Sequence, residues 1–506
     1  MDEKKKLHNL KGSPKNGNMS GTSFQAPQSV ASSVVELKRE IGLLSAVSLI
    51  VSVMIGSGIF ISPSSVLEKS GSVGLCLVMW ALCGAISYFG ALSFAELGTV
   101  VPSSGAEYAF FRAAFTGFHN FFGPLPGFIY IWVIVFLVRP AEVAILVLTF
   151  SEYTYSPIVL YFNMEISPLM ESVLKKLIAL LAVGLITYIN FVSVKIYVKM
   201  QNMFSSLKIL ACLAVIIGGI CHLAKGNIQY INKGFEGTKT NVKDLVLAFY
   251  TGLWSFDGWT SVTVVSEEIK SPNRNIPLSI SLGVPLVTVL YFTMNVAYMS
   301  VLSVEDMIAA PAVAMIFAER LFGPFAPIIP VAVILSTFSC AMSVQFGVSR
   351  LCFAAGRVGH MVECFSYIHI RRMTPAPAVI LQGTLTSIFI ITGSIIRLIE
   401  FVSFIIWIFY GLAMVALIVM RSTKKEAARP FKVPIIIPYF LVALSAFIAV
   451  VPLVLQPDPL FLAAIVFIAI GILAYHFLIY QKKHFKCTRC FCYYVQILLE
   501  VIPSER

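Results

Sequence analysis

Residues 51–65 read VSVMIGSGIFISPSS, an apolar run interrupted in its middle by Gly56, Ser57 and Gly58. The residues on both sides have the composition of a membrane-spanning helix. A break at mid-membrane depth is unusual, because backbone N–H and C=O groups cannot face lipid unpaired. It is tolerated where the freed groups face protein or a cavity. We therefore interpret this stretch as a broken helix, which could either line a binding site or allow neighbouring helices to pack closely.

The composition indicates a membrane protein. Of the 506 residues, 58% are hydrophobic and only 12% are charged. Apolar runs of about 20 residues, the length that crosses a bilayer, recur along the chain. They lack the alternation of transmembrane barrel strands. We predict an all-α polytopic membrane protein with twelve transmembrane helices, at 43–66, 73–98, 127–150, 172–194, 201–223, 245–267, 277–301, 327–350, 376–395, 398–421, 433–454 and 459–481.

The basic residues indicate the orientation of this predicted topology. An even number of spans places both termini on one side, and most Lys and Arg residues fall on that side, which the positive-inside rule makes cytosolic. The net charge of +12 therefore reflects topology rather than nucleic-acid binding. We expect a disordered cytosolic tail over 1–40, a twelve-span domain over 41–481 and a cytosolic C-terminal tail over 482–506.

A second break lies about two hundred residues after the first. Residues 250–260 read YTGLWSFDGWT, where Gly252, Ser255, Asp257 and Gly258 interrupt the sixth predicted span. Five spans separate the start of the first broken span from the start of the second, and an odd number inverts the second unit in the membrane. Interrupted helices at matching positions of an inverted repeat indicate a binding site near the membrane midplane.

The chemistry of such breaks suggests the ligand. The N-terminus of a half-helix presents free N–H groups and a partial positive charge to an anion such as a carboxylate. The C-terminal end of the preceding half-helix presents carbonyls to an ammonium group. Together they match the zwitterionic head of an amino acid. The alternative is that the glycines only allow neighbouring helices to pack closely.

Longer motifs resemble a known family. MIGSGIFISP at 54–63 and GALSFAELGTVVPSSGAEY at 90–108 are similar to amino-acid/polyamine/organocation transporters. SEEIKSPNRNIPLSI at 266–280, RPFKVPIIIP at 429–438 and LLEVIPSER at 498–506 resemble light subunits of the heteromeric amino-acid transporters. Within that group the chain looks most similar to the b-zero-plus type, followed by xCT and the y+L type.

The resemblance implies a LeuT-like fold, a 5+5 inverted repeat with broken helices 1 and 6. It also implies sodium-independent exchange of neutral and cationic L-amino acids across the plasma membrane, without a cofactor. A neutral or aromatic preference, cystine or anionic exchange, and an amino-acid receptor that does not transport remain alternatives. An enzyme is disfavoured, because the seven histidines are scattered and form no HExxH motif.

The resemblance also implies a substrate site. The N–H groups of Ser57 and Gly58 would bind the carboxylate, and the carbonyls of Met54, Trp254 and Asp257 would accept from the ammonium. Trp254 would also act as a gate. Thr260 stands where relatives often have Asn. The expected site residues are Met54, Ile55, Gly56, Ser57, Gly58, Trp254, Asp257 and Thr260.

Four charged residues within predicted spans matter for the site, because charge there is costly and usually functional. Asp257 matches an aspartate that favours cationic substrates in the b-zero-plus type, although it could instead form a structural ion pair. Arg139 could pair with Glu142 one helical turn away or with Asp257, which would weaken a cationic preference. Lys208 matches a lysine whose ammonium occupies the ion site of sodium-coupled relatives; the alternative is that its side chain reaches the cytosolic face.

The positions of the cysteines indicate whether the chain could be disulfide-linked to a partner subunit. Related light subunits are disulfide-linked to a glycoprotein heavy subunit through a cysteine between spans three and four, but residues 151–171 contain none and Asn163 stands near that place. We therefore expect a noncovalent heavy subunit or none. The cluster Cys487, Cys490 and Cys492 could be palmitoylated, unmodified or, with His484, a zinc site.

Overall fold

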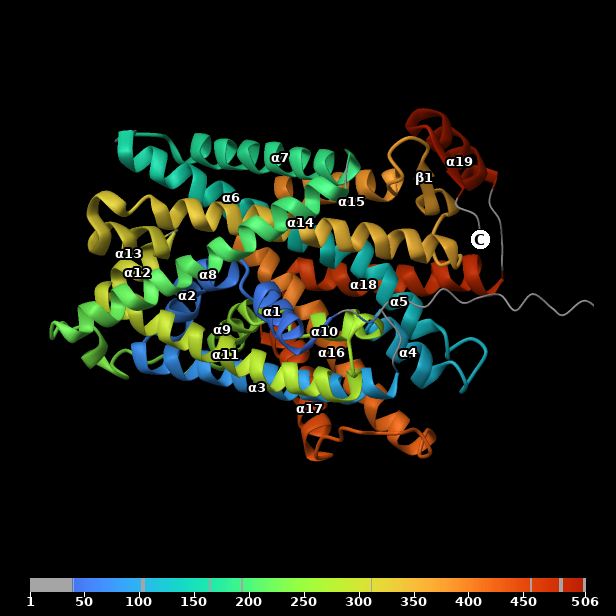
Figure 1. Cartoon of the computed structure of the whole chain (residues 1–506), viewed down its shortest axis with the longest axis horizontal. Coiled ribbons are helices and arrows are strands. Elements are labelled where there is room, and N and C mark those ends of the chain that lie inside the picture. Colours follow the sequence, from blue (N-terminus) through green and yellow to red (C-terminus); the bar gives the residue numbers. More distant parts are fainter. Residues whose placement is uncertain are drawn as a thin grey trace, which may run out of the picture. The chain divides into compact units, whose positions relative to one another are not determined.

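The computed structural model describes residues 39, 41–101, 105–162, 165–192, 194–310, 312–455, 457–481 and 486–503. This part of the chain is mainly helical (Figure 1). Its elements, with η for 3-10 or π turns, are α1 Leu43–Met54, α2 Gly58–Ser70, α3 Val73–Val100, α4 Glu107–Phe115, α5 Leu125–Val133, η1 Ile134–Val138, α6 Arg139–Phe162, α7 Pro168–Val192, α8 Val194–Ala224, η2 Ile231–Lys233, α9 Val242–Ser255, α10 Ser261–Val264, η3 Ser266–Glu268, α11 Pro272–Val301, α12 Val304–Ala309, α13 Val313–Phe322, η4 Gly323–Phe325, α14 Ile328–Arg357, η5 Glu363–Ser366, β1 Tyr367–His369, α15 Ala376–Thr392, α16 Ile395–Thr423, α17 Ile436–Leu455, α18 Pro459–Ala474, η6 Tyr475–Tyr480, α19 Lys486–Leu499 and β2 Val501–Pro503.

The chain is a multi-pass helical membrane protein. Nine helices of the described part are long and apolar enough to cross a membrane, and the bent pair of α1 and α2 gives a tenth candidate. Of the twelve predicted spans, the two outside this set correspond to the broken α9–α10 segment and to α15, which is shorter at 17 residues. The count of twelve therefore stays a prediction.

The long helices pack in pairs that match the proposed repeat. α2 contacts α9, α3 contacts α11, α6 contacts α14 and α7 contacts α15, so helices five predicted spans apart lie side by side. In Figure 1, α3 and α11 can be followed along one another. Two halves related by an inverted repeat are expected to make such contacts around their shared axis.

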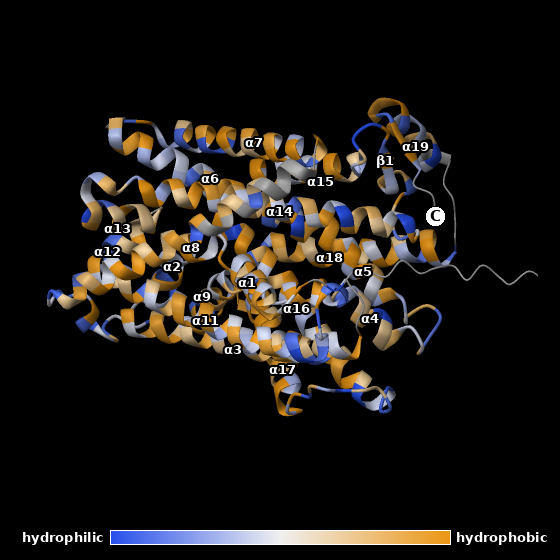
Figure 2. Cartoon of the chain, viewed as in Figure 1, coloured by the Kyte–Doolittle hydropathy of each residue, from blue (hydrophilic) through white to orange (hydrophobic). Residues whose placement is uncertain are grey.

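The outward-facing surface of these helices is apolar. Leu181, Ile436 and Val289 are 75%, 72% and 64% exposed, and Figure 2 shows hydrophobic residues along the full length of helices such as α7 and α3. In water such a surface would cost free energy, roughly 25 cal/mol for each Å² of apolar area. In a bilayer it faces acyl chains.

Both predicted breaks are present. The first span divides into α1 and α2, which meet at 51° across Ile55–Ser57. The sixth divides after Ser255, but its second half, α10, is a single helical turn, shorter than the predicted span implied. Residues 260–265 read TSVTVV, a largely β-branched run that disfavours helix, and the Thr263 hydroxyl donates to the Thr260 carbonyl at 2.7 Å.

The C-terminal segment, predicted only as a cytosolic tail, contains a helix and a strand. β2 pairs antiparallel with β1, and Ile502 lies opposite Ile368. α19, just before β2, contacts η5. Most of the predicted N-terminal tail, Asn163, and residues 482–485 with His484 lie outside the described residues.

Candidate functional site

The two helix breaks lie against each other. A Cβ added at Gly58, the first residue of α2, would fall 2.5 Å from the Cα of Ser255, the last residue of α9. The reverse contact also exists, because a Cβ at Gly258 would fall 2.7 Å from Cγ1 of Val53 and 3.3 Å from the N of Met54. Gly258 also has φ +105°, which side chains disfavour. Each glycine therefore lets the backbone of one break approach the other helix.

The start of α2 presents free backbone donors. Among the described residues, no hydrogen bond begins at the N–H of Ser57, Gly58 or Ile59. The first N–H groups of a helix lack partners within it, and their partial positive charge favours an anion. Ser57 is 2% exposed, so bulk water does not readily satisfy these donors. The geometry fits the predicted carboxylate site.

The carbonyls expected to receive the ammonium differ in availability. The Met54 carbonyl already accepts from Gly56 N at 2.8 Å and from the Tyr291 hydroxyl at 2.6 Å, which uses both of its lone pairs. The Trp254 carbonyl accepts from Asp257 N at 3.1 Å. No group of the described chain donates to the Asp257 carbonyl. The Met54 carbonyl is therefore filled, the Trp254 carbonyl can accept one more hydrogen bond, and the Asp257 carbonyl can accept two.

The side chain of Asp257 is held by a tyrosine. Its Oδ1 accepts a hydrogen bond from the Tyr410 hydroxyl, on α16, at 2.6 Å. Asp257 is half-buried and forms none of the ion pairs found in the described part of the chain. It is therefore an intramembrane carboxylate with one neutral partner and remaining capacity for a cationic group.

Arg139 pairs along its own helix. Its Nη1 lies 2.6 Å from Oε2 of Glu142, and 34% of its side chain is exposed. It directly follows the π turn η1, a feature often found at functional sites. Of the two pairings considered from the sequence, the structure has the local one, and the charge of Asp257 is not neutralised by direct contact with Arg139.

Lys208 is buried beside the first break. The residue is 1% exposed, and Nζ donates to the carbonyl of Ser52, in the last turn of α1. The Cys340 sulfur lies 4.0 Å from the same nitrogen. The alternative that this side chain reaches the cytosolic surface is thus wrong. Lys208 joins α8 to the end of α1 with a buried cation.

The remaining predicted residues lie around these groups. Ile55 is fully buried and Gly56 is half-buried between α1 and α2. Trp254 is half-buried in the last turn of α9. Thr260 occupies the N-cap position of α10 without a side-chain capping bond. All the predicted residues on α1, α2, α9 and α10 therefore belong to the two contacting breaks.

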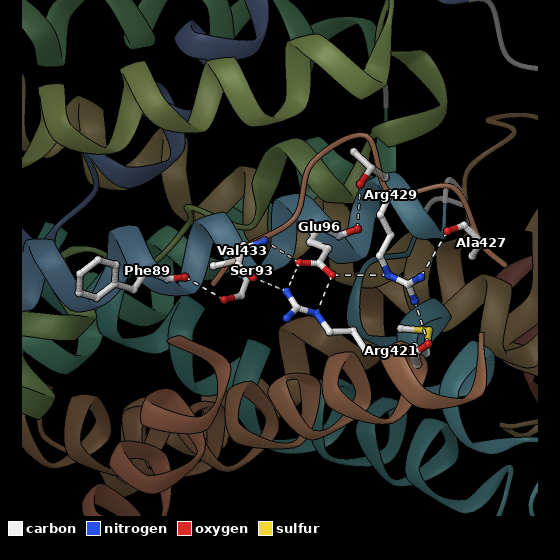
Figure 3. A network of polar contacts seen from close by, with 9 residues as sticks. Phe89, Ser93, Glu96, Arg421, Ala427, Arg429 and Val433 are labelled. Carbon is white, nitrogen blue, oxygen red and sulfur yellow. Dashed lines mark hydrogen bonds and ion pairs between the residues drawn. The ribbon is translucent and has the colours of Figure 1, made fainter. Parts of the chain in front are cut away.

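Sequence reasoning missed several polar partners. Tyr291 and Tyr410 bond to the two breaks from α11 and α16. A second group, the Glu96 network, consists of Glu96 on α3 with Arg421 and Arg429 (Figure 3). The sequence feature that could have revealed this network is Glu96, because it is a carboxylate within a predicted span. The arginines were interpreted only as loop charges.

Among the residues that the structure describes, no cluster of His, Cys, Asp or Glu could hold a metal. The zinc alternative for the C-terminal cysteines involves His484, which lies outside those residues. Cys490 is exposed and Cys492 half-buried, so the first remains accessible for lipid attachment.

Comparison with known proteins agrees with a site that binds amino acids. The amino acid permease family model matches residues 41–480. The chain is 40% identical to the b(0,+)-type amino acid transporter 1 of Mus musculus, over 93% of this chain and 94% of that protein. It is 39% identical to the cystine/glutamate transporter of Homo sapiens, over 93% and 92%. It is 37% identical to the large neutral amino acids transporter small subunit 2 of Mus musculus, over 88% and 82%.

Proposed function

Because this chain belongs to the amino acid permease family, we propose that it carries L-amino acids across the membrane by alternating access, as a sodium-independent exchanger. The observation that supports this most directly is the contact between the two helix breaks, Gly58 against Ser255. It brings the free N–H groups of Ser57 and Gly58 close to the carboxylate-bearing segment around Asp257. One small zwitterion can engage both.

In the proposed binding mode, the substrate carboxylate accepts from the N–H groups of Ser57 and Gly58. The ammonium donates to the open carbonyl of Asp257. The Trp254 carbonyl can accept a second bond, whereas the Met54 carbonyl would contribute only after exchanging one of its present donors. Trp254 lies one helical turn before Asp257, where it can cover a bound substrate as a gate. Ile55, Gly56 and Thr260 line the same stretch.

The substrate range follows from the charges beside the breaks. Within the described residues the Asp257 carboxylate accepts a hydrogen bond from Tyr410, and it favours a cationic side chain while still admitting a neutral one. Arg139 would favour anionic substrates, but Glu142 neutralises it. The relatives include a b(0,+)-type amino acid transporter, the type to which we assign this chain, and a cystine/glutamate transporter, which represents the alternative.

Lys208 supports independence from sodium. Its ammonium is buried against the end of α1 and donates to the carbonyl of Ser52. A fixed cation there satisfies a carbonyl that an unwound helix would otherwise offer to a metal ion. Sodium would be repelled by the charge already present.

One relative is named as a small subunit, which suggests a partner. We infer a noncovalent glycoprotein heavy subunit or none, since residues 151–171 hold no cysteine. The positive-inside distribution supports placing both termini, 1–40 and 482–506, in the cytosol, and we infer a location in the plasma membrane from the resemblance to its family.

Uptake into proteoliposomes containing this chain alone tests the proposal. Radiolabelled arginine and leucine are supplied outside, with and without internal amino acid, in sodium or choline buffer. We expect uptake that requires internal amino acid and is the same in both buffers. Substrate binding without uptake would support a receptor instead, and uptake that requires sodium would refute the role of Lys208.

A further inference from the structure

A cavity of about 550 Å³ lies where α16 ends and α17 begins. It is lined by Arg421, near the end of α16, and by the four residues Lys432–Ile435 that lead into α17. This cavity is distinct from the two helix breaks and plays no part in the proposed transport site. Its lining combines two cations with the apolar groups of Val433, Pro434 and Ile435.

The Glu96 network beside this cavity carries more positive than negative charge. Glu96 is fully buried, and its carboxylate accepts from Arg421 Nε at 2.9 Å and from Val433 N at 2.8 Å. Arg429 Nε lies 3.6 Å from the same carboxylate. The two guanidinium side chains are only 11% and 10% exposed. Two buried cations thus share one anion.

Two nitrogens of this network have no hydrogen-bond acceptor in the described part of the chain. Nη1 of Arg421 makes none of the hydrogen bonds or ion pairs found in the described part of the chain, and Arg429 Nε has no hydrogen-bond acceptor. Lys432, on the cavity rim, is exposed and likewise forms none of those ion pairs. Burying unbalanced charge is costly unless a counter-charge is near. The cavity is therefore positioned to receive an anion.

The surroundings indicate that this anion is attached to a lipid. α17 begins at Ile436, and Ile435, Ile436, Tyr439 and Phe440 are between 45% and 72% exposed. An apolar strip that starts at a basic cavity fits a molecule with a charged head and acyl chains. Basic pockets between transmembrane helices on the cytosolic side are typical of headgroup binding.

We propose that the cavity between α16 and α17 binds the phosphate of an anionic phospholipid. Arg421 and Lys432 contact the phosphate, which balances the excess charge of the Glu96 network. The acyl chains lie along the exposed face of α17. The same lipid thereby links the loop 424–435 to the membrane surface.

Native mass spectrometry of the full chain in detergent tests this site. Phosphatidylglycerol is titrated against phosphatidylcholine with the same acyl chains. We expect phosphatidylglycerol to bind more tightly, and Lys432→Gln to weaken its binding about fivefold, as is typical for one basic residue at a membrane surface. Lys425→Gln is the matched control, since Lys425 is exposed in the same loop but does not line the cavity.

Two results would overturn the site: equal binding of both lipids, or equal effects of Lys432→Gln and Lys425→Gln. A third arm adds inorganic phosphate to the bound phosphatidylglycerol complex. We expect no displacement at matched concentration, because the acyl chains contribute to binding. Displacement would show a site for small free anions and would refute the lipid.

Discussion

Gly58 touches Ser255: a Cβ at position 58 would fall 2.5 Å from the Cα of Ser255. Gly258 makes the reverse contact with Val53. The two broken helices therefore hold each other at the points where their helical hydrogen bonding stops. A side chain at either glycine has to separate them, and separation moves the free N–H groups of α2 away from Asp257.

We expect Gly58→Ala to abolish uptake of arginine and leucine alike, because the methyl group displaces the backbone of α9. Overpacking of this kind costs about 1–3 kcal/mol of folding free energy, so a folded fraction should remain for measurement. Proteoliposome uptake, normalised to the folded protein recovered by gel filtration, measures the effect. Gly58→Val should be more severe.

The control for this substitution is Gly184→Ala. A Cβ at Gly184, in the middle of α7, meets no atom within 4 Å, so its uptake should equal that of the unmodified chain. Normal transport by Gly58→Ala would mean that the two breaks need not touch, and the proposed carboxylate site would be wrong.

Asp257→Asn should lower arginine transport far more than leucine transport. The amide keeps an acceptor for Tyr410 but loses the charge that attracts a cationic side chain. Hydrogen bonds to charged groups are worth about 1.5–3 kcal/mol, so we expect kcat/KM for arginine to fall at least about tenfold. Competition between labelled arginine and leucine measures the ratio directly. Equal losses for both substrates would argue that Asp257 has only a structural role.

Glu142→Gln should shift selectivity in the same direction by a different route. Without the carboxylate 2.6 Å away, Arg139 becomes an unpaired cation on α6. Like charge then disfavours arginine, while leucine uptake changes little. The arginine-to-leucine ratio is again the measurement, and an unchanged ratio would place Arg139 too far from the substrate to matter.

Lys208→Met should reduce arginine and leucine uptake to the same degree. The lysine contacts the backbone of α1 rather than the segment around Asp257, so its loss affects the shape of the break and not side-chain selectivity. Lys176→Met is a matched control, because Lys176 also donates to a backbone carbonyl, that of Ile391, but at the surface. A selective loss of arginine uptake in Lys208→Met would contradict this assignment.

Glu96→Gln tests the Glu96 network as a source of stability. Removing one partner of a buried ion pair leaves uncompensated charge, which costs about 3–5 kcal/mol. Here two arginines lose their shared anion, so thermal unfolding in detergent should begin at a clearly lower temperature. The comparison is Glu305→Gln, whose pairing with Lys233 at 3.8 Å is exposed to solvent and should hardly matter. Similar melting curves for the two variants would contradict the network's role.

The helix breaks could be predicted because their cause is local. A Gly-Ser-Gly stretch within an apolar run weakens a helix wherever it lies, and the spacing of two such stretches can be counted along the chain. The pairing of Arg139 with Glu142 could also be predicted, since the two residues lie one turn apart on one helix.

The partners of the breaks could not be predicted, because they come from distant segments. Tyr291 reaches Met54 across 237 residues and Tyr410 reaches Asp257 across 153. A buried tyrosine in an apolar span gives no sign of which carbonyl or carboxylate it will meet. The partner of Arg421 could not be predicted for the same reason. A basic residue at the end of a span resembles a topology signal in the sequence, and only the fold brings it into contact with Glu96.

Acidification should destabilise the protein through His360, just beyond α14. Burial, and then the neighbouring charge of Arg112, lower the pKa of His360 below its ordinary value of 6.5. The unfolded chain therefore takes up a proton as the pH falls through 6.5 while the folded chain resists, and stability is lost toward acidic pH. In the folded state Nδ1 lies 3.3 Å from the Tyr108 hydroxyl, and Phe128 packs against the ring. We expect the melting temperature to fall between pH 7 and pH 5.5, and His360→Asn to reduce that fall. His222→Asn, on α8, should leave it unchanged; if it reduced the fall as much as His360→Asn, the pH dependence would not arise from this contact.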